Sequence, residues 1–260
     1  DDSSTLHGAV TSDLTLESGK TYTLDGELIV KAGATLNIEE GVTVVSLYDD
    51  KVDYIIVEQG AKINAVGTAS SPIVMTSQKE EPCAWGGIHI CGFARTNAEG
   101  GKGSSEIAGA TYGGDKDADN SGVLKFVRVE YTGYAFDEEH EANGITFYGV
   151  GSGTTVENCE AYHGSDDGFE FFGGSVNVKN MVAVNCSDDS FDWTEGWNGR
   201  GENLVAFQAP ESVFGYDCYC HVEADNNENN FAATPVSHPV LSNLVLVGNG
   251  AGKQGIRLRR

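Results

Sequence analysis

Two seven-residue stretches decide the fold of this chain: Ser165-Asp166-Asp167-Gly168-Phe169-Glu170-Phe171 and, 22 residues later, Ser187-Asp188-Asp189-Ser190-Phe191-Asp192-Trp193. Each follows a second shared phrase at the same offset, Val156-x-x-Cys159-x-Ala161-x-His163 in one case and Val178-x-x-Met181-x-Ala183-x-Asn185 in the other. Internal repetition at this period is typical of solenoids, in which each repeat is one coil of a stack. We therefore predict that these two segments lie in adjacent coils.

The same frame recurs through the chain, with steps of 22 to 24 residues that lengthen where loops intrude. It returns upstream as Leu124-x-x-Val127-x-Val129 and downstream as Leu241-x-x-Leu244-x-Leu246, and Gly33–Ile38 is echoed 27 residues later by Gly60–Ala65. The segments alternate with period 2, are bounded by Gly, Asn and Asp, and carry no helical apolar stripe. The sequence predicts an all-β fold, a right-handed single-stranded parallel β-helix with coils of roughly 22–27 residues.

We expect residues 1–260 to form one β-helix domain with two long polar loops, at about 97–122 and about 221–239. A shorter acidic excursion, Asp137–Glu141, stretches one coil. The chain ends at Ile256-Arg257-Leu258-Arg259-Arg260, in the middle of an alternating pattern. Because a solenoid needs a polar cap, we expect the C-terminal end to be truncated.

The charge balance excludes one class of partner. The chain has 39 acidic and 16 basic residues, a net charge of −23, whereas nucleic-acid binding needs a basic face. No stretch reaches the roughly 18 apolar residues of a membrane span. The six cysteines match no zinc spacing, and their pairing stays open, although Cys83 and Cys91 could bridge.

Several phrases resemble a large group of uncharacterised β-helix proteins that Gram-negative bacteria secrete, of the pectate-lyase-like β-helix fold class. They are Trp85–Ile88, Asp119–Glu130, Gly149–Val156, Asp166–Gly174 and Gly255–Arg259. The resemblance implies an exported protein, secreted or on the outer cell surface, with a lipid anchor as one means of attachment. It implies no established activity.

The paired acids are candidate metal ligands. Asp166, Asp167, Asp188 and Asp189 fall at one phase of adjacent coils, which stack about 4.8 Å apart, so they should form a ladder at one corner. Like charges this close need a cation or hydrogen-bond donors, and calcium prefers such oxygens. The alternative is that each Asp caps backbone N–H groups in a turn.

Glu170 and Asp192 are also in phase. With Phe169, Phe171 and Trp193 facing inward, the two acids should share an outer face with Thr146. A carboxylate pair in this position could hydrolyse a glycoside.

His163 has two readings. It is in phase with Tyr131, Asn185 and Gln208, so it could belong to a polar ladder at a corner, or it could be a general base beside Asp166. His163-Gly164 and the Asp pairs are similar to polygalacturonase motifs, but there the Asp pair precedes His-Gly, and here it follows. The order does not support that activity.

Three functions remain open at this point. The first is a non-catalytic module that binds a polysaccharide, a cell-surface glycan or another macromolecule along its long face and is stabilised by calcium. The second is a polysaccharide lyase or glycoside hydrolase using Asp166, Asp167, Asp188 or Glu170. The third is a structural stalk or filament unit. An aromatic cluster favours the first if its rings are exposed, because exposed rings stack on sugars, but packing in the core is the commoner fate of aromatic residues and the sequence does not separate the two. The cluster comprises Trp193, Trp197, Phe214, Tyr216 and Tyr219.

Overall fold

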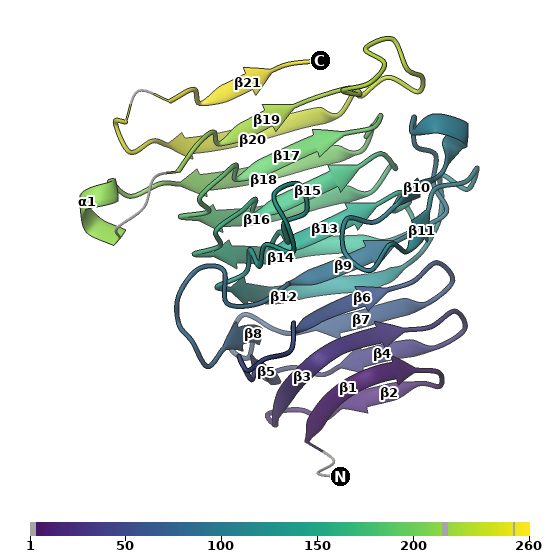
Figure 1. Ribbon diagram of the computed structural model, residues 1–260, viewed down its shortest axis with the longest axis vertical. Helices are drawn as coiled ribbons and strands as arrows, with labels where there is room; N and C mark the ends of the chain where they lie inside the picture. Colours follow the sequence, from purple (N-terminus) through teal and green to yellow (C-terminus); the bar gives the residue numbers. More distant parts are fainter. Residues whose placement is uncertain (1–3, 215–217, 252) are drawn as a thin grey trace.

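The chain forms a stack of β-coils, seen in a computed structural model that describes residues 4–214, 218–251 and 253–260. The coils follow one another along the longest axis, with the two ends of the chain at opposite ends of the stack (Figure 1). One sheet of 19 strands winds through the stack, and its strands pair in parallel with the equivalent strands of the coils before and after them. The architecture is therefore the predicted parallel β-helix.

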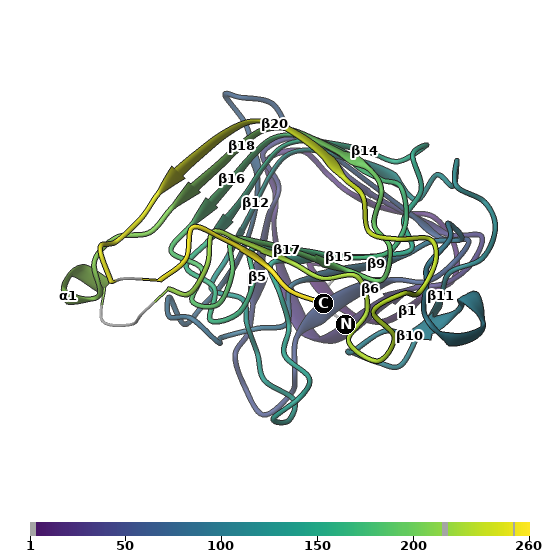
Figure 2. The same ribbon diagram turned by 90° about the horizontal axis from the view of Figure 1, so that it is seen from above.

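Each coil contributes strands to three faces, which superpose in the view along the stack (Figure 2). Face A consists of β1 (Thr5–Val10), β6 (Tyr54–Val57), β9 (Ile88–Cys91), β13 (Ile145–Tyr148), β15 (Phe169–Phe172), β17 (Phe191–Thr194), β19 (Val222–Ala224) and β21 (Ile256–Leu258). Face B begins with β2 (Leu14–Leu16), β4 (Thr35–Ile38) and β7 (Lys62–Val66), and face C with β5 (Thr43–Ser46) and β8 (Ile73–Ser77). β3 (Thr21–Val30) runs from face C into face A, pairing with both β5 and β6. Five longer strands run from face B into face C: β12 (Gly122–Glu130), β14 (Thr155–Tyr162), β16 (Asn177–Val184), β18 (Arg200–Phe207) and β20 (Val240–Val247).

The strand register confirms the coil length. Phe169 pairs with Phe191, so the 22-residue echo is one coil, and Thr35 pairs with Lys62, so the 27-residue echo is another. Where Ile88 pairs with Ile145, the step is much longer, because the intervening chain leaves the stack and returns.

The first predicted loop contains a short 3₁₀ turn, Glu99–Gly101, and a small antiparallel hairpin, β10 (Gly103–Ser104) and β11 (Thr111–Tyr112). The second loop, predicted at about 221–239, starts later than predicted. Residues 222–224 form β19, because Val222 continues the inward column of Phe191, and the excursion starts at Asp225. The only α-helix of the described residues is the four-residue α1 (Glu211–Phe214), and no helix in this part of the chain is long and apolar enough to cross a membrane.

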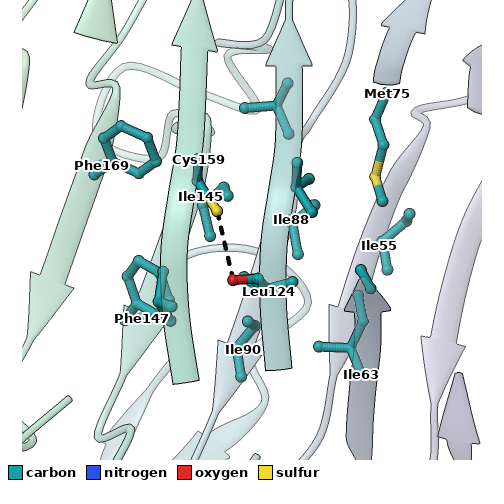
Figure 3. Packing of buried hydrophobic residues seen from close by; sticks show 14 of the residues in the cluster. Ile55, Ile63, Met75, Ile88, Ile90, Leu124, Ile145, Phe147, Cys159 and Phe169 are labelled. Atoms are coloured by element: carbon teal, nitrogen blue, oxygen red, sulfur yellow. Dashed lines mark hydrogen bonds between the residues drawn. The ribbon is translucent and has the colours of Figure 1, made fainter. Parts of the chain in front are cut away.

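The interior is filled by columns of apolar side chains that repeat from coil to coil (Figure 3). Phe169, Phe171 and Phe191 are at most 2% exposed and Trp193 is 7% exposed, which confirms the predicted inward direction. The Phe171 ring lies 5.1 Å from the ring of Phe147 and 3.9 Å from that of Trp197. Since strand neighbours point to opposite sides, Glu170 and Asp192 must point outward from face A.

An asparagine ladder marks the bend between faces B and C. Its members have φ between 55° and 57°, a left-handed conformation that Asn tolerates better than most residues. They are Asn158, Asn180, Asn203 and Asn243. Each amide of the three later residues donates to the Oδ1 before it, at 2.8, 2.7 and 3.0 Å in chain order. The sequence carries a signal for this ladder, because the same residue type, Asn, recurs at one phase of successive coils.

Candidate functional site: an acidic cavity on face A

The outward row of face A brings acids from distant parts of the chain side by side. Register pairs Thr146 with Glu170, Glu170 with Asp192, Asp192 with Glu223, and Glu223 with Arg257. Neighbouring strands lie about 4.8 Å apart, so each side chain is a close neighbour of the next. The predicted juxtaposition of Glu170 and Asp192 with Thr146 is confirmed.

The two long excursions meet over this row, at Asn97. The Asn97 side-chain amide donates to Asn226 Oδ1 at 2.9 Å and to the Pro235 carbonyl at 3.0 Å, and Asn227 Nδ2 donates to Asn97 Oδ1 at 3.1 Å. The segments are therefore locked together although about 130 residues separate them, a closure that the sequence pattern did not reveal.

Glu195 ties the first excursion to face A at the end of β17. Its Oε2 accepts a hydrogen bond from the Tyr112 hydroxyl at 2.8 Å and another from the Thr96 hydroxyl at 2.8 Å. The excursions thus wall off part of the outer face instead of projecting into solvent.

The walls enclose a cavity of about 200 Å³ over β15 and β17. Phe172 supplies an apolar wall, and Arg259 and Arg260 stand at one side. Six carboxylates also line the cavity, from Glu106, Glu170, Asp192, Glu195, Asp225 and Glu228. We call this the acidic cavity.

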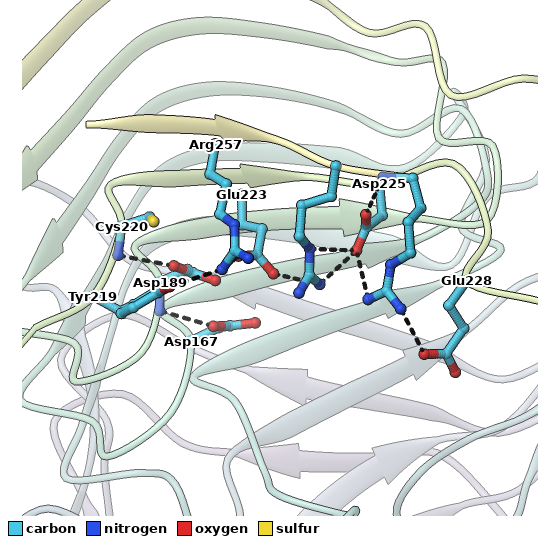
Figure 4. Close-up of polar contacts among 10 residues, drawn as sticks. Asp167, Asp189, Tyr219, Cys220, Glu223, Asp225, Glu228 and Arg257 are labelled. Carbon is cyan, nitrogen blue, oxygen red and sulfur yellow. Dashed lines mark hydrogen bonds and ion pairs between the residues drawn. The ribbon is translucent and has the colours of Figure 1, made fainter. Parts of the chain in front are cut away.

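Arginines from the end of the chain neutralise one side of the cavity (Figure 4). Arg259 Nη2 lies 2.6 Å from Asp225 Oδ2 and 2.5 Å from Glu223 Oε1, and Arg260 lies 3.5 Å from Glu228. The pairs of Arg259 with Glu223 and Asp225 are partly buried, whereas Glu228, the partner of Arg260, is exposed.

The opposite side of the cavity is compensated less: Arg259 lowers the pKa of Asp192, but no basic side chain of the described residues forms an ion pair with Glu170 or Asp192. Burial raises the pKa of both Glu170 and Asp192 well above their usual range, and neighbouring carboxylates raise these pKa values further. Burial likewise raises the pKa of Glu106 to about 7, with His140 opposing and Glu195 adding to that effect. This wall therefore favours protonation or a positively charged ligand.

The predicted Asp ladder divides into two groups. Asp166, Asp167 and Asp188 bring carboxylate oxygens within 4.8 Å of one another, whereas Asp189 groups with Cys220 and Glu223. Asp167 Oδ1 accepts the Asp189 N–H at 2.9 Å, and Asp189 Oδ1 accepts the Cys220 N–H at 2.9 Å. One oxygen of each of these two acids thus caps the next coil, as the turn interpretation requires.

The first group still fits calcium. Ca²⁺–oxygen distances of roughly 2.3–2.6 Å allow two ligands of one ion to lie about 5 Å apart, and these three oxygens meet that limit. Glu141, from the acidic excursion, lies beside Asp166 and is a fourth carboxylate at this corner. The sequence pattern had not associated Glu141 with the ladder, because only the folded excursion brings it there.

His163 lies in the polar corner ladder. Its Nε2 is 2.9 Å from Asn185 Nδ2, and its ring centroid is 4.0 Å from that of Tyr162 and 6.4 Å from that of Tyr131. Burial and Arg128 lower its pKa. Among the described residues, His163 belongs to none of the clusters of His, Cys, Asp and Glu side chains that could hold a metal ion.

The structure decides between the two roles that the sequence left open for the tryptophans, a sugar-binding surface and core packing. Trp193 and Trp197 are 7% and 1% exposed and belong to the core, because they fill the widening interior beside Phe171. The Tyr219 hydroxyl accepts a hydrogen bond from Arg257 at 2.8 Å. Tyr216 and the side chain of Phe214 lie outside the described residues. All six cysteines are free thiols, of which Cys83 is exposed.

Comparison with known families gives one match, to the pectate-lyase-like β-helix domain over residues 8–260. No curated protein matches the chain.

Proposed function

The chain belongs to the pectate-lyase-like β-helix family, which confirms a right-handed parallel β-helix. We propose that it is an exported, surface-exposed module that binds a glycan on face A without cleaving it. The observation that carries the proposal is the acidic cavity, formed where two excursions from separate coils lock together over one face. Ligand sites are concave, with apolar walls and a few convergent polar groups.

The chemistry of the cavity suits a hydroxyl-rich ligand. Carboxylates such as Glu170 and Asp192 accept hydrogen bonds from sugar hydroxyls, and Arg259 and Arg260 donate to sugar oxygens. Phe172, 9% exposed because its ring stacks on Tyr148, supplies the apolar part of the wall. The cavity combines acceptors, donors and an aromatic wall within one enclosed space.

We further propose calcium at the corner formed by Glu141, Asp166, Asp167 and Asp188. These residues would hold the ion through oxygen atoms, which calcium prefers. Bound there, it would offset the mutual repulsion of the carboxylates and fasten the 137–141 excursion to the coil that carries Asp166.

A polysaccharide panel tests the glycan proposal. We expect wild-type protein to bind at least one glycan, and Asp192→Asn to weaken that binding at least tenfold because it changes the cavity wall. Glu202→Gln is the matched control, since Glu202 is an acid on face B, away from the cavity. Failure to bind any member of the panel, with and without calcium, would contradict the proposal.

One observation favours a hydrolase as the second candidate. Oxygens of Asp167, Glu170 and Asp192 lie within 4.8 Å of one another, near the roughly 5–5.5 Å that separates the carboxyl groups of retaining glycosidases. The raised pKa of Glu170 would keep it protonated as a general acid. Product release from the same panel, abolished in Glu170→Gln with folding intact, would establish this activity. The stalk or filament hypothesis stays a prediction, which sedimentation of the purified protein would test.

A further inference from the structure

Four carboxylates of the acidic cavity form no ion pair within the described part of the chain. No basic side chain of residues 4–214, 218–251 and 253–260 lies within ion-pair distance of them, whereas Asp225 and Glu228 are paired with arginines. The four are Glu106, Glu170, Asp192 and Glu195. Buried charges are normally paired, so in their ionised form these carboxylates call for a cation.

Unsatisfied polar atoms among these carboxylates and beside them give a second, independent indication. Asn143 is 1% exposed and its amide is directed at the cavity wall, where Nδ2 donates to Glu170 Oε2 at 2.6 Å; its Oδ1 is buried and has no hydrogen-bond partner in the described part of the chain. Asp192 Oδ1 is likewise buried and unpartnered. Both atoms are acceptors, and buried acceptors without a donor are rare. The missing group must therefore donate hydrogen bonds.

A primary ammonium group meets both requirements. It carries a positive charge and three N–H donors and has no acceptor. The size of the cavity argues for an organic cation over a bare ion, because about 200 Å³ corresponds to roughly seven water molecules at about 30 Å³ each. Phe172 in the wall adds an apolar and cation–π surface that a hydrated metal ion would not use.

The cavity is also polarised along its length. Glu170 on β15 lies at one end, Arg259 and Arg260 follow β21 at the other, and Asp192 on β17 lies between them. An ammonium group fits the first end and is repelled from the second, where hydroxyl or ring oxygens would accept hydrogen bonds from the arginines. A ligand with an amine at one end and oxygens at the other satisfies both.

We infer that the acidic cavity binds a saccharide unit with an unmodified primary amine, an amino sugar whose nitrogen is not acetylated. The ammonium lies between Glu170 and Asp192, where Asp192 Oδ1 lacks a donor, and the sugar ring contacts Phe172 in the wall. This inference rests on the proposed glycan-binding function and narrows it to one substrate class.

Titration calorimetry measures how tightly the protein binds a glucosamine oligosaccharide and its N-acetylated counterpart, in a buffer that contains a chelator to remove divalent ions. We expect the free amine to bind at least tenfold more tightly than the acetylated form, which keeps the sugar and removes the charge. Asp192→Asn should abolish this preference, and Glu202→Gln, the acid on face B, should preserve it.

Three outcomes separate the inference from the proposed function. Equal binding of both oligosaccharides, lost in Asp192→Asn, would overturn the amine requirement and leave glycan binding intact. Binding of spermidine but of no saccharide, with the same dependence on Asp192, would overturn the sugar requirement. Binding of no glycan in either this assay or the polysaccharide panel would overturn the inference and the proposed function together.

Discussion

The asparagine ladder gives the sharpest test of how the coils are held together. Asn180 occupies its centre, donating to Asn158 Oδ1 at 2.8 Å and accepting from Asn203 Nδ2 at 2.7 Å, with φ of 55°. Asn180→Ala removes both hydrogen bonds, worth about 1 kcal/mol each. It also places Ala in the left-handed region, which costs about 1 kcal/mol. The expected loss in the free energy of unfolding is about 3 kcal/mol.

Two further variants separate these contributions. Asn180→Gly removes the same hydrogen bonds but adopts positive φ without strain, so we expect a loss of about 2 kcal/mol. Asn243→Ala, at the last position of the ladder, removes one hydrogen bond and imposes the same backbone cost, so it should also lose about 2 kcal/mol.

Equilibrium unfolding in urea measures these losses, followed by circular dichroism with the slope of the free energy against urea compared between variants. A solenoid can unfold in parts, so the comparison holds only where that slope is unchanged. If Asn180→Ala proves no more destabilising than Asn243→Ala, or Asn180→Gly as destabilising as Asn180→Ala, the reasoning about the ladder is wrong.

Four other predictions follow from single features. Because burial raises the folded pKa of Glu106 from 4.5 to about 7, the stability that its neutral form contributes is lost as the pH rises through 7. Between pH 5 and pH 8 the free energy of unfolding should therefore fall less in Glu106→Gln than in wild-type protein, by on the order of 3 kcal/mol, while Glu170 and Asp192 still titrate in both. An equal fall in the two proteins would refute the assignment. Phe171→Ala should cost about 3–5 kcal/mol in the same assay, because the ring is 1% exposed and stacked on both sides; a loss below 1 kcal/mol would mean that the columns repack freely. Millimolar calcium should raise the melting temperature of wild-type protein and leave the melting temperature of Asp166→Asn unchanged. An equal rise in the two proteins would place the ion elsewhere. With a thiol reagent, one cysteine of the folded, reduced protein should react rapidly and all six in urea, since Cys83 alone is exposed; fast reaction of a second thiol would show that a buried coil opens.

Repetition explains why the stack could be predicted from the chain alone. The 22-residue echo fixes which residues pair across coils, and alternation then places Phe169 inside and Glu170 outside. Both inferences depend on short-range periodicity, which a linear sequence displays directly. The same logic correctly placed Asp192 beside Glu170 and Trp193 inside. It left the place of Trp197 open, because pattern alone does not tell a core aromatic from an exposed one.

The acidic cavity required the tertiary structure. Its floor is a regular row that the repeat predicts, but its walls come from excursions that have no period. Only folding brings Asn97 against Asn226, Glu195 against Tyr112, and Glu141 against Asp166. The sequence by itself therefore determined the coil, its inward and outward faces and the acids of its outer row. The tertiary structure decided which of those acids line the cavity without forming an ion pair among the described residues. The reason is that the cavity depends on contacts between non-repeating segments far apart in the chain.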